Sequence, residues 1–268
     1  MSEAQLFASM TFPEIYERVL VQPLFRPFAE AVVERLKPVP GDSLIDVACG
    51  TGIVARIARQ TLGSSARIVG VDVAAPMLAV ARTVDASIDW REGNAVALPV
   101  REGESFSLLA CHQGLQFFPD KPTAVREMQR ALAPDGRMAI ACWRSLQDIP
   151  AALELNEIAE RHVGPIVDSR HSFGNAADLQ ALLTDNGFHD CRVETFSHDV
   201  RFSDGALFAT LNAMAVIGMT EKGKKLNEAQ RGELAGRIAA ESHAVIARYR
   251  KQGEFVIPLS TNIATARA

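Results

Sequence analysis

The 268-residue chain lacks the features that mark several large classes of protein. Its four cysteines, Cys49, Cys111, Cys142 and Cys191, form no C-x-x-C pair, so neither a zinc ribbon nor a disulfide scaffold is indicated. The net charge of −4 provides no basic field for a nucleic-acid backbone. No basic stretch followed by an apolar core opens the chain, so no signal peptide is expected. These absences predict a cytoplasmic protein that does not bind nucleic acid.

The sequence also lacks a membrane span. Its most apolar run, residues 205–220, is bounded by Asp204 and Glu221 and contains Asn212, so it is too short to cross a bilayer. A hydrophobic content of 48% with 22% charged residues is typical of a globular protein, and the length suffices for a full core. No Ser-His-Asp or Cys-His signature and no metal-ligand cluster is present.

A strand–loop–helix pattern runs through residues 44–56, with the sequence LIDVACGTGIVAR. The apolar residues before the loop are too few for a helix, and those after it recur at helical spacing. Small residues in such a loop let a ligand approach the backbone at the start of the helix. Gly50, Gly52 and Ala55 match the G-x-G-x-x-G/A spacing of dinucleotide-binding loops.

Two acids stand at the ends of neighbouring strands. An unpaired buried carboxylate is costly, so Asp46 is expected to meet a backbone N–H or a ligand cation, and its charge disfavours a phosphate beside the turn. The strand at residues 67–73 brings Asp72 to a position where a carboxylate can accept both hydroxyls of a ribose. A solvated loop Asp or a cap for the helix at Pro76 is the alternative for Asp72.

With these motifs the chain resembles the class I S-adenosylmethionine-dependent methyltransferases. It is most similar to the type 11 small-molecule branch, which includes the UbiE-type quinone methyltransferases. The resemblance runs from about Tyr16 to the C-terminus and is strongest from Leu44 to Trp143. It implies an α/β, Rossmann-like fold with a mostly parallel seven-stranded sheet that ends in an antiparallel hairpin. It also implies S-adenosylmethionine as cofactor.

The resemblance further implies which residues contact this cofactor. They are Tyr16, Asp46, Ala48, Gly50, Gly52, Asp72, Val73, Met77, Asn94, Ala95 and Gln113. In the family, a tyrosine placed like Tyr16 closes over the methionine end of the cofactor. The helices predicted in residues 11–37, which contain Tyr16, are also expected to cover one face of the sheet. Asn94 stands where the family has an adenine-binding Asp, and an Asn in a turn is the competing interpretation. Met77 is placed against the adenine, or it is a core residue.

The strand at residues 106–113 ends in His112 and Gln113, and ligands of open α/β sheets bind beyond such carboxyl ends. These two residues are therefore expected to border the reactive methyl group. A methyl sulfonium is already activated, so no metal is expected. His112, with an ordinary pKa of about 6.5, is the candidate base for an acidic acceptor. A histidine hydrogen-bonded within the strand end is the alternative.

We expect one domain over residues 1–268. Residues 1–40 form a helical cover, residues 41–203 and 253–268 form the core, and residues 204–252 are an inserted helical segment. The insertion separates two predicted strands by far more than a hairpin loop, which indicates a substrate lid or a homodimer surface.

The predicted function is methyl transfer from S-adenosylmethionine to an O, N or C atom of a small organic acceptor. A nicotinamide-dependent oxidoreductase is one alternative, because it shares the spacing of Gly50, Gly52 and Ala55. A non-catalytic protein that binds S-adenosylmethionine is the other.

Overall fold

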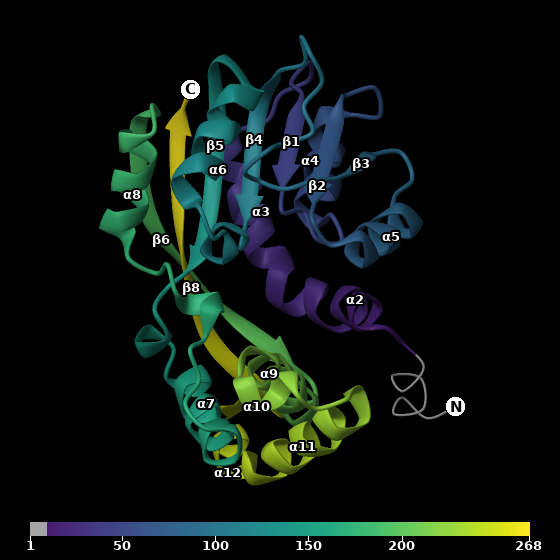
Figure 1. The fold of residues 1–268 in the computed structure, drawn as a ribbon, viewed down its shortest axis with the longest axis vertical. Helices are drawn as coiled ribbons and strands as arrows, with labels where there is room; N and C mark the ends of the chain where they lie inside the picture. The colour runs from purple at the N-terminus through teal and green to yellow at the C-terminus, as the bar shows by residue number, and fades with distance from the viewer. Residues whose placement is uncertain (1–9) are drawn as a thin grey trace. The chain divides into compact units, whose positions relative to one another are not determined.

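The computed structural model describes residues 10–268 and is built around one mixed β-sheet (Figure 1). The strand order is β3-β2-β1-β4-β5-β8-β6, and the short β7 pairs with β8 beside this path. The strands are β1 (Leu44–Val47), β2 (Ile68–Asp72), β3 (Asp89–Glu92), β4 (Phe106–His112), β5 (Leu132–Trp143), β6 (His189–Phe202), β7 (Arg250–Lys251) and β8 (Glu254–Arg267). The predicted Rossmann-like sheet is confirmed, with eight strands instead of seven because the two-residue β7 was not predicted.

Strands β1 to β5 run parallel, and β8 runs antiparallel to β5. β1 is buried along its whole length, as expected for a central strand covered on both faces. Because the strands are parallel, the carboxyl ends of β1, β2 and β4 lie on the same edge of the sheet (Figure 1). This edge carries the two acids and His112.

Four further helices and one short 3₁₀ turn belong to the part of the chain that forms the sheet. They are α4 (Ile53–Leu62), α5 (Ala75–Val84), η2 (Leu115–Phe117), α6 (Lys121–Ala131) and, after a long interval, α8 (Ala176–Asp185). α4 buries an apolar stripe that includes Ile53, Val54 and Ile57, which is the helical spacing predicted from the sequence. α8 begins at Asn175, whose side chain accepts hydrogen bonds from two backbone N–H groups of its first turn.

The N-terminal cover consists of three consecutive helical segments: α2 (Phe12–Ile15), the π-helical η1 (Tyr16–Phe25) and α3 (Arg26–Leu36). Pro23 lies inside η1, where it removes one backbone donor, and the Arg26 N–H reaches back five residues to the Val21 carbonyl. α3 packs Phe28, Val32 and Leu36 into the core.

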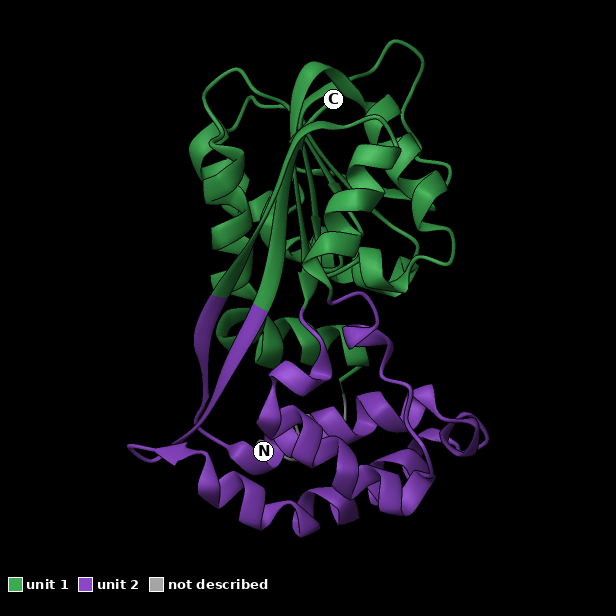
Figure 2. Cartoon of the chain, turned by 90° about the vertical axis from the view of Figure 1, so that its left-hand side faces the viewer, with its two compact units in different colours: residues 1–143, 175–196, 261–268 green, residues 144–174, 197–260 purple. Residues whose placement is uncertain are grey.

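The chain divides into two compact units, which Figure 2 shows in two colours. The first contains residues 1–143, 175–196 and 261–268, and the second contains residues 144–174 and 197–260. The predicted insertion at residues 204–252 falls entirely in the second unit, together with residues 144–174, which the sequence had assigned to the core. β6 and β8 contribute residues to both units. That the chain is one functional domain stays a prediction.

The second unit is mainly helical. Its helical segments are η3 (Leu146–Asp148), α7 (Pro150–Val163), η4 (Ser169–His171), α9 (Gly205–Met219), α10 (Glu221–Lys224), α11 (Glu228–Glu241) and α12 (His243–Arg248). α11 starts with a capping box formed by Asn227 and Gln230. Within residues 10–268, no helix combines the length and the apolar character that a membrane crossing requires.

A polar network lies inside this second unit. The Asp168 carboxylate accepts from Arg170 at 2.6 Å and from the Asn156 amide at 2.9 Å. Arg170 also donates to Asn212 on α9 at 3.0 Å, and Asn212 donates to Asn156 on α7 at 3.3 Å. The members satisfy one another, which explains how the otherwise apolar α9 can bury an amide.

In the first unit, one aromatic ring fills the space beside two glycines. A Cβ added to Gly52 would lie 2.1 Å from the Trp90 ring, and one added to Gly70 would lie 2.3 Å from it. The indole N–H donates to the Asp85 carbonyl at 2.7 Å, which fixes the ring. Trp90 on β3 therefore packs against the loop that follows β1.

We predict that Gly52→Ala destabilises the fold more than Gly63→Ala. Both glycines have a left-handed φ, +89° and +82°, but among the described residues an added Cβ at Gly63 meets nothing. The clash with Trp90 should add roughly 1–3 kcal/mol to the loss of unfolding free energy. Urea unfolding of the two variants measures the difference, and equal losses would contradict this packing.

Candidate functional site

The loop after β1 holds three residues in the left-handed conformation. Their φ angles are +57° at Ala48, +56° at Gly50 and +89° at Gly52. A left-handed alanine is uncommon, so the surrounding bonds must hold it there. The Gly50 N–H donates to Asp72 Oδ2 at 2.8 Å, and the Gly52 N–H donates to the Cys49 carbonyl at 2.8 Å. The loop is thus tied to the end of β2.

Asp46 is the one charged residue of β1 and is 1% exposed. Its Oδ2 accepts the Ala55 N–H at 3.2 Å, so it caps α4 from the preceding strand. Among the described residues its Oδ1 finds no hydrogen-bond partner. Burial, together with the nearby Asp72 charge, raises the pKa of Asp46 to about 8. The side chain therefore has one oxygen left for a ligand cation or proton.

Asp72 is held by the backbone on both sides. Its Oδ1 accepts the Ala74 N–H at 2.8 Å, while Oδ2 accepts from Gly50. Ala74 is the cap residue that precedes α5, so Asp72 accepts a backbone N–H immediately before this helix, and its binding of a ribose stays a prediction. A carboxylate oxygen has two lone pairs, so each can still accept a ligand hydroxyl.

The two glycines of the loop have different surroundings. An added Cβ at Gly52 would strike Trp90, whereas one at Gly50 would meet no atom of residues 10–268 within 4 Å. The Thr51 hydroxyl between them is buried and has no partner in the described part of the chain. Open space therefore lies beside Gly50. Sequence reasoning missed Thr51, whose only signal is its place between the two glycines.

Tyr16 is the first residue of η1. Its ring lies 4.8 Å from that of Phe25 and 6.3 Å from that of Phe12, measured between centroids. Burial raises the pKa of its phenol, with further contributions from the negative charges of Glu17, Asp72 and Asp46. The phenol therefore stays protonated near the two acids, as a hydrogen-bond donor.

His112 is the last residue of β4, and Gln113 follows it at the same edge. His112 is 8% exposed, its ring meets Phe25 edge-on at 6.2 Å, and its Nε2 has no partner among residues 10–268. Burial lowers the pKa of His112 to about 3, far below the ordinary value that sequence reasoning assumed. Gln113 has a left-handed φ of +57°, and its amide donates to Thr261 Oγ1 at 3.0 Å.

The remaining predicted contacts lie after β2 and β3. The Asn94 side-chain oxygen accepts the Val96 N–H at 3.1 Å, so the turn interpretation of this residue is observed. Met77 is partly buried, Ala95 is buried, and Val73 is 69% exposed. That these four residues contact an adenosine stays a prediction.

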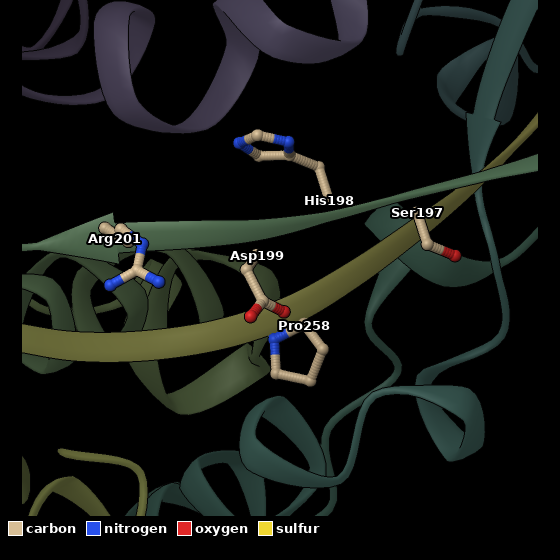
Figure 3. A pocket seen from close by; sticks show the side chains of 5 residues that line it. All are labelled: Ser197, His198, Asp199, Arg201 and Pro258. Atoms are coloured by element: carbon tan, nitrogen blue, oxygen red, sulfur yellow. The ribbon is translucent and has the colours of Figure 1, made fainter. Parts of the chain in front are cut away.

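A shallow hollow in the second unit does not belong to this constellation. It is lined by exposed side chains of β6 and β8: Ser197, His198, Asp199, Arg201 and Pro258 (Figure 3). Arg201 is paired with Glu254 at 3.3 Å, and Asp199 lies 3.8 Å from Lys251. In Figure 3 the side chains of His198 and Asp199 leave opposite faces of the strand, so they do not converge on one ligand.

The first unit thus has the fold and the loop of a Rossmann-like methyltransferase, with acids at the ends of β1 and β2. Residues 45–140 match the family model described as a methyltransferase domain. This stretch of the chain is a methyltransferase domain, as the sequence resemblance predicted.

Two curated relatives are quinone methyltransferases by name. The chain is 36% identical over 120 residues to 2-phytyl-1,4-naphtoquinone methyltransferase of Thermosynechococcus vestitus, which covers 44% of this chain and 53% of the relative. It is 29% identical over 176 residues to demethylmenaquinone methyltransferase of Lactococcus lactis, with coverages of 58% and 69%. The chain spans about half the length of the first curated relatives it matches.

Solved structures support the fold. Phosphoethanolamine N-methyltransferase 2 of Haemonchus contortus, in complex with phosphomonomethylethanolamine and S-adenosylhomocysteine, aligns with a TM-score of 0.57 at 18% identity. The alignment covers 99% of this chain and 57% of that structure.

We predict that Asp46→Asn stabilises the fold above about pH 5. The acid keeps its proton up to about pH 8 when folded but loses it near pH 4 when unfolded, so the wild type loses stability as pH rises between these values. The amide can still accept from Ala55 and does not titrate. The unfolding free energy of Asp46→Asn should exceed that of the wild type by on the order of a few kcal/mol at pH 8, and the two should match near pH 4. Denaturant unfolding at both pH values measures this, with Asp72→Asn as control; a variant that is weaker at every pH would contradict it.

Proposed function

We propose that this chain binds S-adenosylmethionine at the edge formed by β1, β2 and β4 and transfers its methyl group to a small organic acceptor. The proposal is carried by Asp46, which precedes the glycine loop. Its buried Oδ1 has no hydrogen-bond partner among residues 10–268, while its Oδ2 accepts the Ala55 N–H. A pyrophosphate would add negative charge beside two acids. A ligand ammonium would stabilise the ionised form of Asp46, which favours an amino-acid-bearing cofactor over a dinucleotide.

The residues at this edge fit such a ligand. Asp46 would hold the ammonium, and Asp72 would accept the ribose hydroxyls while it keeps the loop in place through Gly50. The open side of Gly50 admits a ligand against the backbone. Tyr16 would close the methionine end, as the family resemblance implies. When bound, S-adenosylmethionine supplies an already activated methyl group.

Catalysis then depends on how the acceptor is placed relative to the methyl group. Holding an acceptor in line and away from water can lower a barrier by roughly 7–11 kcal/mol. His112 contributes a neutral hydrogen-bonding nitrogen at the end of β4, because its burial disfavours the imidazolium. It orients the acceptor's hydroxyl or amine and is not a titrating base. Gln113, fixed by Thr261, borders the same place.

The names of the two relatives make quinone-type phenols the first acceptors to test. A cytoplasmic location is part of the proposal, supported by four cysteines that are all free thiols. Residues 204–252 would serve as substrate lid or as homodimer surface, and the absence of a basic field argues against nucleic acid as acceptor.

Calorimetric titration tests the cofactor. S-adenosylhomocysteine should bind more tightly than NAD⁺, and Asp72→Ala should weaken it at least tenfold, since each lost charge-assisted hydrogen bond contributes about 1.5–3 kcal/mol. Tighter binding of NAD⁺ would favour the oxidoreductase alternative. Binding without methyl transfer across an acceptor panel would favour the non-catalytic alternative.

The role of His112 is tested by the pH profile of kcat/KM between pH 5 and 8. Because His112 stays neutral throughout this range, the wild type should show no inflection that depends on it. His112→Gln keeps a hydrogen-bonding group and should cost less than the roughly 10²–10⁴-fold that a general base contributes. An inflection near pH 6.5 that disappears in the variant would restore the base assignment.

A further inference from the structure

An ion pair joins the N-terminal cover to the glycine loop. Arg56 Nη2, on α4, donates to both carboxylate oxygens of Glu17 at 2.8 and 2.9 Å. Its Nε donates to the Gly52 carbonyl at 3.3 Å. One guanidinium thus contacts the cover segment η1 on one side and the loop after β1 on the other.

The pair differs from the surface ion pairs of this chain. The side chains of Arg56 and Glu17 are only 18% and 17% exposed, and they lie far apart in the sequence. By contrast, Arg26 and Glu30 on α3 are one helical turn apart and more exposed, at 35% and 50%. Exposed pairs of that kind contribute little, whereas a partly desolvated pair with two bonds to one carboxylate fixes geometry.

The segment that this pair holds, η1, has irregular backbone hydrogen bonding. η1 is π-helical and contains Pro23, which donates no backbone hydrogen bond. Its placement therefore depends on side-chain contacts with the rest of the first unit. Glu17 directly follows Tyr16, so the ion pair acts within one residue of the side chain that lies near Asp46 and Asp72.

We propose that Glu17 and Arg56 are positioning residues that hold Tyr16 over the bound cofactor and thereby set how long it stays bound. This inference rests on the proposed function. Release of the cofactor requires η1 to move, and that movement breaks the bonds between Arg56 and Glu17. Because the same guanidinium contacts Gly52, the cover and the loop are released together.

The test is the dissociation rate of S-adenosylhomocysteine from the full chain, measured by surface plasmon resonance. Glu17→Gln removes the negative charge, and Arg56→Lys removes the planar guanidinium whose Nη2 binds Glu17 while its Nε binds Gly52, so each should raise the dissociation rate roughly tenfold. The association rate should change much less. Arg26→Gln, which breaks the pair on α3, is the matched control and should leave both rates unchanged.

A second comparison asks whether the pair acts through Tyr16. Tyr16→Ala should itself speed dissociation, and adding Glu17→Gln to it should have little further effect, because the two changes remove the same closure. Melting temperatures of the ligand-free variants show whether a variant is merely unfolded. Arg56→Met, which removes the positive charge as well, should raise the dissociation rate further than Arg56→Lys does if the hold is ionic.

The outcomes separate the two proposals. Unchanged dissociation in Glu17→Gln and Arg56→Lys, with normal wild-type binding, would overturn the inference and leave the function intact. Full additivity with Tyr16→Ala would also overturn it, because the pair would then act only on general structure. No binding of S-adenosylhomocysteine to the wild type would overturn the proposed function itself.

Discussion

The capping of α4 by a carboxylate from β1 is the interaction on which the first unit depends. A glycine precedes the helix and offers no side chain, so Asp46 reaches across the loop to the Ala55 N–H. This bond keeps the strand, the loop and the helix start at fixed distances. It also requires a carboxylate inside the core, which raises its pKa and leaves one oxygen without a protein partner among residues 10–268. Stability and ligand binding thus place opposite demands on one residue.

The second acid at this edge, Asp72, is not buried in the core as Asp46 is. Asp72 accepts two backbone N–H groups and is only partly buried, so its charge is supported where it stands. The two acids therefore share an edge of the sheet but differ in burial and in the number of backbone N–H groups that they accept. This division suits a ligand with a cationic group at one end and neutral hydroxyls nearby. Burial, and then the negative charges of Glu17 and these acids, raise the pKa of the Tyr16 phenol, so it remains protonated.

The sequence predicted the sheet and its order of elements because the relevant signals are local. Buried strands are short apolar runs, and the helix that begins at Ile53 follows a periodic pattern. It could not predict the pKa of His112, which depends on burial beside Phe25, a residue distant in the chain. Nor could it show that Asn94 uses its side-chain oxygen in its own turn. Such tertiary contacts leave no pattern in a single sequence.

The position of Trp90 has a consequence for how this sequence can change over time. Its ring occupies the volume that side chains at residues 52 and 70 would otherwise need. Three sites on different elements therefore share one space, and their substitutions are coupled. A smaller residue at position 90 would remove the clash at either glycine, although the left-handed φ of Gly52 would still disfavour a side chain. A larger residue at position 52 or 70 therefore first requires loss of the indole. Variation at these positions should arise in matched sets.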